Sequence, residues 1–162
     1  MKIVVLGPPG SGKTTLAKVL QSLLSIPYIK GDDLFWQNGE ESNVLLFKAE
    51  VAKKISASDW IYEGHVTKVF DLLSQHSPVL VVIKETPGDF LNAIFRDLKS
   101  IVFGGDRLKA KKKISHHLRS WKKMSQARKR ISDSYSQIAP KNVFIWDRKS
   151  ESIKDFVKRI SQ

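Results

Sequence analysis

The feature that most constrains this chain is a glycine-rich stretch near its start, placed between a short apolar run and an amphipathic segment. Residues 7–14 read Gly-Pro-Pro-Gly-Ser-Gly-Lys-Thr and satisfy the pattern G-x-x-x-x-G-K-[ST]. Glycines at these places let backbone N–H groups turn inward around a phosphate, and the following helix directs its positive end at the same anion. The stretch therefore predicts a strand, a phosphate-binding loop and a helix in succession.

Each part of this loop has an expected role in binding a nucleoside triphosphate. Lys13 is expected to reach the β- and γ-phosphates, and the Thr14 hydroxyl is expected to be a ligand of Mg²⁺. The alternative is a fortuitous glycine-rich turn, and the flanking strand and helix patterns argue against it. The residues predicted to bind the nucleotide are Gly7, Pro8, Pro9, Gly10, Ser11, Gly12, Lys13, Thr14 and Thr15.

Short apolar runs alternate with amphipathic segments along the rest of the chain. Strands are predicted at 2–6, 27–30, 60–63, 79–83 and 143–146. Helices are predicted at 14–24, 43–55, 66–73, 90–103, 114–138 and 152–160. This alternation indicates an α/β protein with a parallel sheet and helices on both faces. The length of 162 residues fits one domain, 1–162.

Composition excludes several classes of protein. The chain contains no cysteine, which excludes disulfides, thiolate metal sites and cysteine nucleophiles. No apolar run approaches the roughly 20 residues that a membrane-spanning helix needs. The apolar run at 3–6 is too short for the core of a signal peptide, and Pro8 ends it. We therefore expect a cytoplasmic protein.

The charge of the chain is large and unevenly placed. The formal net charge is +12, and residues 109–130 contain ten Lys and Arg side chains with no Asp or Glu. A solvated helix face is one explanation of this run. The other is a surface that faces an anion, which could give weak nucleic-acid binding through Lys109–Arg130. The sequence leaves both open.

Three stretches resemble a known group of proteins. Residues 7–17 resemble the opening of small nucleoside-monophosphate-kinase-like proteins, which include adenylate, shikimate and gluconate kinases. Residues 31–36 and 59–64 are similar to the DNA topology modulation protein family, whose members are adenylate-kinase-like. The resemblance covers most of the chain and is weakest from 104 to 130. It implies a three-layer P-loop NTPase fold, a strand order of 2-3-1-4-5, a small lid and ATP as phosphoryl donor.

The resemblance also implies roles on the acceptor side, which is expected within about 33–58 and at the end of the third strand. Asp32 is expected to approach the transferred phosphate, as a catalytic carboxylate or through Mg²⁺. Asp33 is expected to bind the acceptor, with a helix cap as the alternative. Glu63, Gly64 and His65 end the third strand, where open α/β sheets bind ligands, and are expected to bind the acceptor. A Glu-Gly pair that merely ends a strand is the alternative.

On the donor side, the resemblance implies a lid at about 104–113, hinged at Gly104 and Gly105. Arg96 matches an arginine that packs on the donor adenine, with an ordinary charge on the helix surface as the alternative. Arg130 is expected to neutralise charge on the transferring phosphoryl group, with Arg119 and Arg128 as alternatives. No Asp closes the fourth strand, which argues against a motor ATPase.

One departure concerns the acceptor. Adenylate kinase holds the acceptor phosphate with two arginines, and the matching positions here are Phe35 and Thr67, with Lys48 or Lys68 as possible substitutes. The sequence therefore predicts a phosphotransferase that uses ATP and Mg²⁺ on a nucleoside, a nucleotide or another hydroxyl compound. The alternative is a nucleotide-dependent regulator that binds DNA or RNA and hydrolyses ATP slowly.

Overall fold

A five-stranded parallel sheet forms the centre of the computed structural model, which describes residues 1–37, 40–56, 58–103 and 107–161. The strands are β1 (Lys2–Leu6), β2 (Tyr28–Lys30), β5 (Trp60–Glu63), β6 (Val79–Ile83) and β7 (Val143–Trp146). Their order across the sheet is β2-β5-β1-β6-β7. Counted along the chain, this is the predicted order 2-3-1-4-5, which the structure confirms.

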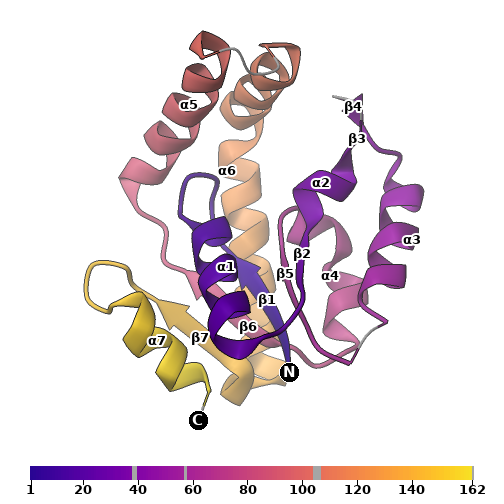
Figure 1. Ribbon diagram of the computed structural model, residues 1–162, viewed down its shortest axis with the longest axis vertical. Coiled ribbons are helices and arrows are strands. Elements are labelled where there is room, and N and C mark those ends of the chain that lie inside the picture. Colours follow the sequence, from indigo (N-terminus) through magenta and orange to yellow (C-terminus); the bar gives the residue numbers. More distant parts are fainter. Residues whose placement is uncertain (38–39, 57, 104–106, 162) are drawn as a thin grey trace.

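Helices cover both faces of this sheet, as predicted (Figure 1). Alternate residues of β1 show why: Val4 and Leu6 belong to one buried cluster, and Ile3 and Val5 belong to the other. The helices are α1 (Lys13–Leu24), α2 (Gly31–Phe35), α3 (Val44–Lys54), α4 (Val66–Ser74), α5 (Pro87–Val102), α6 (Arg107–Ile138), η1 (Pro140–Asn142) and α7 (Ile153–Ile160). The first cluster packs α2, α3, α4 and α6 against the sheet, and the second packs α1 and α7.

Helices α5 and α6 lie side by side and rise above the sheet, opposite the short hairpin of β3 (Trp36–Gln37) and β4 (Glu40–Glu41) (Figure 1). The hairpin and α2 were not predicted, because they are too short to show a period. Helix α6 begins seven residues earlier than predicted, so positions 107–113 of the expected lid belong to its first turns. The expected hinge at Gly104 and Gly105 lies outside the described residues.

Helix α5 begins at Pro87, three residues before the predicted start. Proline suits the first turn of a helix because its missing N–H would have no helical partner there. The Thr86 side chain accepts a hydrogen bond from the backbone of Asp89, and the Asp89 carboxylate accepts one from the Thr86 N–H. This reciprocal pair fixes the helix start beside the phosphate loop.

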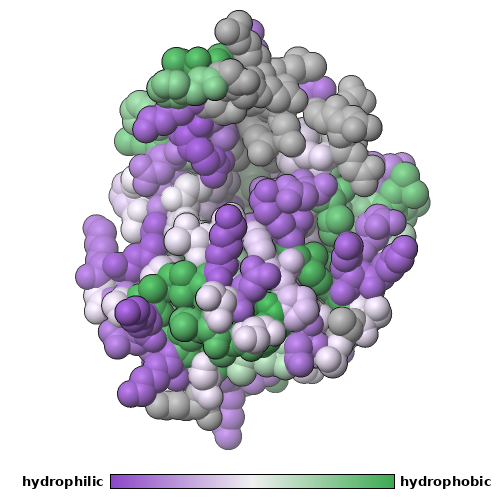
Figure 2. All heavy atoms as spheres, in the orientation of Figure 1, coloured by the Kyte–Doolittle hydropathy of each residue, from purple (hydrophilic) through white to green (hydrophobic). Residues whose placement is uncertain are grey.

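Hydrophilic side chains are dispersed over the lower half of the face seen in Figure 2, around smaller apolar patches. Among the described residues, no helix combines the length and the apolar composition that crossing a membrane requires.

Candidate active site

The phosphate loop lies between β1 and α1, at the carboxyl edge of the sheet. Gly10 and Gly12 have φ values of 81° and 84°, which glycine adopts without strain. A Cβ atom on Gly10 would lie 2.2 Å from the Asp89 carbonyl oxygen, so only glycine lets the loop pack against the start of α5. A Cβ atom on Gly12 would meet nothing within 4 Å. The loop is thus packed against α5 at Gly10 and open around Gly12.

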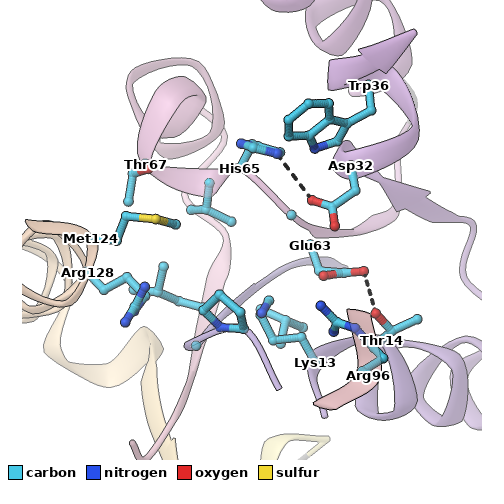
Figure 3. Close-up of a pocket in the computed structure, with 16 residues that line it drawn as sticks. Lys13, Thr14, Asp32, Trp36, Glu63, His65, Thr67, Arg96, Met124 and Arg128 are labelled. Atoms are coloured by element: carbon cyan, nitrogen blue, oxygen red, sulfur yellow. Dashed lines mark hydrogen bonds and ion pairs between the residues drawn. The ribbon is translucent and has the colours of Figure 1, made fainter. Parts of the chain in front are cut away.

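Lys13 reaches back over this loop. Its Nζ atom donates a hydrogen bond to the Pro8 carbonyl oxygen at 2.8 Å. Desolvation lowers the pKa of Lys13, against the opposing effects of Glu63 and Asp32, and the neighbouring Arg128 and Arg96 lower it further. Three cations and two carboxylates therefore act on one another across a single cleft (Figure 3).

Glu63 ends β5 beneath the loop and is only 1% exposed. Its Oε1 atom accepts hydrogen bonds from the Thr14 hydroxyl at 2.9 Å and from the Tyr28 hydroxyl at 2.6 Å. Burial and the Glu63 carboxylate raise the pKa of Tyr28, so this phenol remains a donor. Tyr28 was missed in the sequence, because nothing in a three-residue strand shows which side chain will face the neighbouring strand end.

Asp32 and His65 meet on the other side of the cleft. Asp32 Oδ1 lies 3.5 Å from His65 Nε2, and the imidazole packs on the Phe35 ring with a centroid distance of 3.9 Å. A Cβ atom on Gly31 would lie 2.4 Å from the Gly64 carbonyl oxygen, so glycine is needed where the two strand ends meet. Gly64 itself has a φ of 90°. This close approach brings Asp32 beside His65.

Asp33 points away from the cleft, although it was expected to bind the acceptor. Its side chain is 67% exposed and pairs with Lys30 at 2.5 Å. Asp32 lines the cleft, together with Glu63 and Gly64. The structure therefore separates two adjacent carboxylates that the sequence placed together.

Arg128, one of the three candidate arginines, lines the cleft and is 7% exposed. It donates to Glu85 Oε2 at 3.3 Å, and Ser125 donates to the same oxygen at 2.8 Å. Burial lowers the pKa of Arg128, and the Glu85 carboxylate opposes this. Arg130 is exposed and does not line the cleft, and the side chain of Arg119 is outside the described part of the structure.

Some of the other residues predicted on the donor side line the cleft, and others do not. Arg96 lines the cleft from α5, and its Nε atom donates to Asp97 Oδ1 at 3.0 Å. Thr15 is exposed on α1 and does not line the cleft. Ser11 is buried below the loop, with no hydrogen-bond partner for its hydroxyl among the described atoms.

The oxygen atoms in the cleft suit Mg²⁺. The described residues contain no group of three or more His, Cys, Asp and Glu side chains that could hold a metal alone. The cleft instead offers the Thr14 hydroxyl and the carboxylates of Asp32 and Glu63. Mg²⁺ is usually held by one or two carboxylates together with substrate phosphates and water, so these residues fit it.

The strand order, the glycine loop and the cleft at the carboxyl ends of the strands define a P-loop protein of the kinase superfamily. Within that class, the chain belongs to the family described as an AAA domain, whose model matches residues 3–114.

Individual relatives agree with this class. A cytidylate kinase from Sulfolobus acidocaldarius is 32% identical over 82 residues, which are 50% of this chain and 43% of the relative. An adenylate kinase from Clostridium beijerinckii is 48% identical over 50 residues, which are 31% of this chain and 23% of that enzyme. The matched stretches thus span less than half the length of these curated relatives.

A solved structure extends the likeness of the fold to nearly the whole chain. A gluconokinase from Sinorhizobium meliloti 1021 superposes with a TM-score of 0.57 and 13% identity, over 98% of this chain and 88% of that one. Identity at this level shows the fold alone. The resemblance to the DNA topology modulation family stays a prediction.

Proposed function

We propose that this protein is a cytoplasmic phosphotransferase that moves the γ-phosphate of ATP to a small hydroxyl acceptor. The observation that carries the proposal is the meeting of Lys13, Thr14, Asp32, Glu63 and Arg128 around one cleft at the carboxyl edge of the sheet. Phosphoryl transfer needs mainly positioning and charge stabilisation, and these side chains supply both.

The donor side would bind the triphosphate through the loop. Backbone N–H groups and Lys13 hold the β- and γ-phosphates, and Arg96 lies where it can contact the donor. Arg128 exchanges its Glu85 partner for the transferring phosphoryl group and neutralises charge there. Thr14, Glu63 and Asp32 would hold Mg²⁺, which supplies positive charge to the phosphate oxygens when it is bound.

The acceptor hydroxyl would lie beside Asp32. Its oxygen forms the new bond to the γ-phosphorus while the bond from that phosphorus to the bridging oxygen of ADP breaks. The hydroxyl proton passes to Asp32, and His65 keeps this carboxylate in place from 3.5 Å away. Residues at about 33–58 would surround the acceptor, and a lid at about 104–113 would close over the reactants and exclude water.

An acceptor screen with ATP and Mg²⁺ tests this function. We expect at least one nucleoside, nucleotide or sugar to raise ADP formation above the rate without acceptor, with a phosphorylated product seen by mass spectrometry. The Lys13→Ala variant is the control and should lose roughly 10²-fold or more of that rate, because it removes a charge that stabilises the transition state. Full activity in this variant would contradict the use of the loop.

A second function has one observation in its favour. Lys122, Lys123 and Lys129 are exposed on α6, in a chain with a net charge of +12. A nucleotide-dependent regulator that binds DNA or RNA could use such a face. The kinase is favoured because nucleic-acid binding does not require a buried carboxylate such as Glu63 beside the phosphate loop.

A further inference from the structure

We propose that the acceptor is an uncharged hydroxyl compound, a nucleoside or a sugar, and that phosphate esters are poor acceptors. The inference rests on the proposed function, because it concerns the acceptor half of the same cleft. Its basis is the way in which charge is divided between the two halves.

The cations that line the cleft gather on the side of the loop. Figure 3 shows Lys13, Arg96 and Arg128 toward the loop and α6, with Asp32 on the other side of the central Glu63. In the described part of the cleft, the acceptor half thus holds carboxylates and no lysine or arginine. Mg²⁺ held by these carboxylates would be shared with the phosphates of ATP, whose negative charge exceeds that of the metal, so a phosphate on the acceptor would still meet net negative charge in this half.

His65 does not reverse this balance. Among the described residues, it is the one His, Lys or Arg side chain that lines the acceptor half, and its Nε2 atom faces Asp32 Oδ1 at 3.5 Å. A second anion would therefore find no surplus positive charge at this end of the cleft.

Lysines near this half do not line the cleft and already have other partners. Both substitutes considered from the sequence, Lys48 and Lys68, are among them. Lys48 pairs with Asp71 at 2.6 Å, and the Nζ atom of Lys68 lies 4.9 Å from the centre of the Phe35 ring. A third lysine, Lys30, pairs with Asp33 at 2.5 Å. A phosphate ester would have to break one of these contacts to gain a cation.

Two like charges about 6 Å apart, at an effective dielectric constant of about 20, repel enough to change an affinity by roughly 10²-fold. A neutral hydroxyl avoids this repulsion and can donate its hydrogen to a carboxylate instead. Trp36 and His65 add ring surface to the same wall, against which the face of a sugar or a base can pack. The wall therefore suits a neutral ring compound with hydroxyl groups.

Matched pairs of acceptors test the inference. The pairs are cytidine with CMP, adenosine with AMP, and glucose with glucose 6-phosphate. Transfer is measured as kcat/KM, and binding is measured by calorimetry with the loop saturated by a non-hydrolysable ATP analogue. For at least one pair, we expect the neutral compound to exceed its ester by roughly 10²-fold in both kcat/KM and affinity. The pair that shows this difference tells whether the acceptor is a nucleoside or a sugar.

Thr67, an exposed residue that lines the cleft, allows the preference to be reversed. Thr67→Arg should raise kcat/KM for the esters by at least about 10-fold, since it adds the missing cation, and Thr67→Gln should not. Esters that are preferred by the unaltered protein would overturn the inference and leave the phosphotransferase intact. If the protein neither phosphorylates nor binds any of the six compounds, both this inference and the proposed phosphotransferase function are contradicted.

Discussion

Glu63 shows how one buried side chain can connect three separate elements. It lies on β5, and it accepts hydrogen bonds from Thr14 on α1 and from Tyr28 on β2. A buried carboxylate is costly unless its oxygens have donors, so these two hydroxyls stabilise the charge as well as the geometry. Because Thr14 is also the expected ligand of Mg²⁺, the position of the metal would depend on this contact.

The two adjacent aspartates should differ in their effect on catalysis. We expect Asp32→Asn to lower kcat by roughly 10²-fold, because the amide cannot take the proton of the acceptor hydroxyl. Asp33→Asn is the matched control, since Asp33 is exposed and pairs with Lys30. Steady-state kinetics with the best acceptor of the screen measures both. A large loss in Asp33→Asn with none in Asp32→Asn would reverse the assignment.

Arg128 and Arg130 offer a similar comparison. Arg128→Gln should lower kcat by roughly 10³-fold if its charge neutralises the transferring phosphoryl group. Arg130→Gln should change kcat less than about threefold, because its side chain is exposed outside the cleft. Thermal unfolding of both variants separates a loss of catalysis from a loss of fold, since Arg128 is buried beside Glu85. The opposite ranking of the two kcat values would assign this role to Arg130.

At the scale of elements, α6 explains why the sequence could have identified Arg128. Ile131 and Tyr135 pack into the core, and Arg128 precedes them by three and seven residues. These spacings place the three residues on one face of the helix, and Met124, four residues earlier, also faces the cleft. Arg130 lies about 200° around the helix from Arg128. Arg130, which the resemblance implied for this role, therefore lies on another face of the helix from the cleft.

Local sequence patterns predicted the five strands but not the contacts between segments that are distant in the chain. The five strands were found because continuous apolar runs are typical of a sheet buried on both faces. The orientation of Asp32 against Asp33 depends on a five-residue helix, α2, and on the close approach of Gly31 to Gly64. Contacts of this kind form between segments far apart in the chain, and local patterns do not report them.

The start of α5 should be a point of high local stability. Asp89 is fully buried, caps the helix and accepts from Arg148 at 2.8 Å and 3.0 Å. Asp89→Ala should lower the free energy of unfolding by about 3 kcal/mol, because it removes the carboxylate that pairs with Arg148 and removes a cap. Asp155→Ala, at the equivalent capping position of α7, is exposed and should cost about 1 kcal/mol or less. Chemical denaturation of both measures the difference, and equal losses would contradict this view of Asp89.

For the whole molecule, the net charge of +12 raises the question of nucleic-acid binding. Dispersed charge attracts polyanions weakly, whereas a specific surface aligns its cations with successive phosphates. The two cases differ in how steeply binding depends on salt.

Three exposed lysines of α6 provide the test. We expect a fluorescent DNA duplex to bind with a Kd on the order of 10⁻⁵ M near physiological salt, with or without ATP. The triple variant Lys122→Gln, Lys123→Gln, Lys129→Gln is compared with the unaltered protein. Its slope of log affinity against log salt concentration should differ by less than the contribution of about one phosphate contact. A slope that flattens by about three contacts, with submicromolar binding before substitution, would favour the regulator over the kinase.

The burial of Lys13 against its own loop should affect how many protons are taken up when the nucleotide binds. In the free protein, desolvation lowers the pKa of Lys13. A bound triphosphate would raise it again, so association in alkaline buffer should take up protons. Affinity should be constant below the free-state pKa, fall as the pH rises through it, and level off above the bound-state pKa. Calorimetry in buffers of different ionisation enthalpy measures this uptake, and Lys13→Arg, whose charge does not titrate in this range, should abolish it. Equal uptake in that variant would assign the proton to another group.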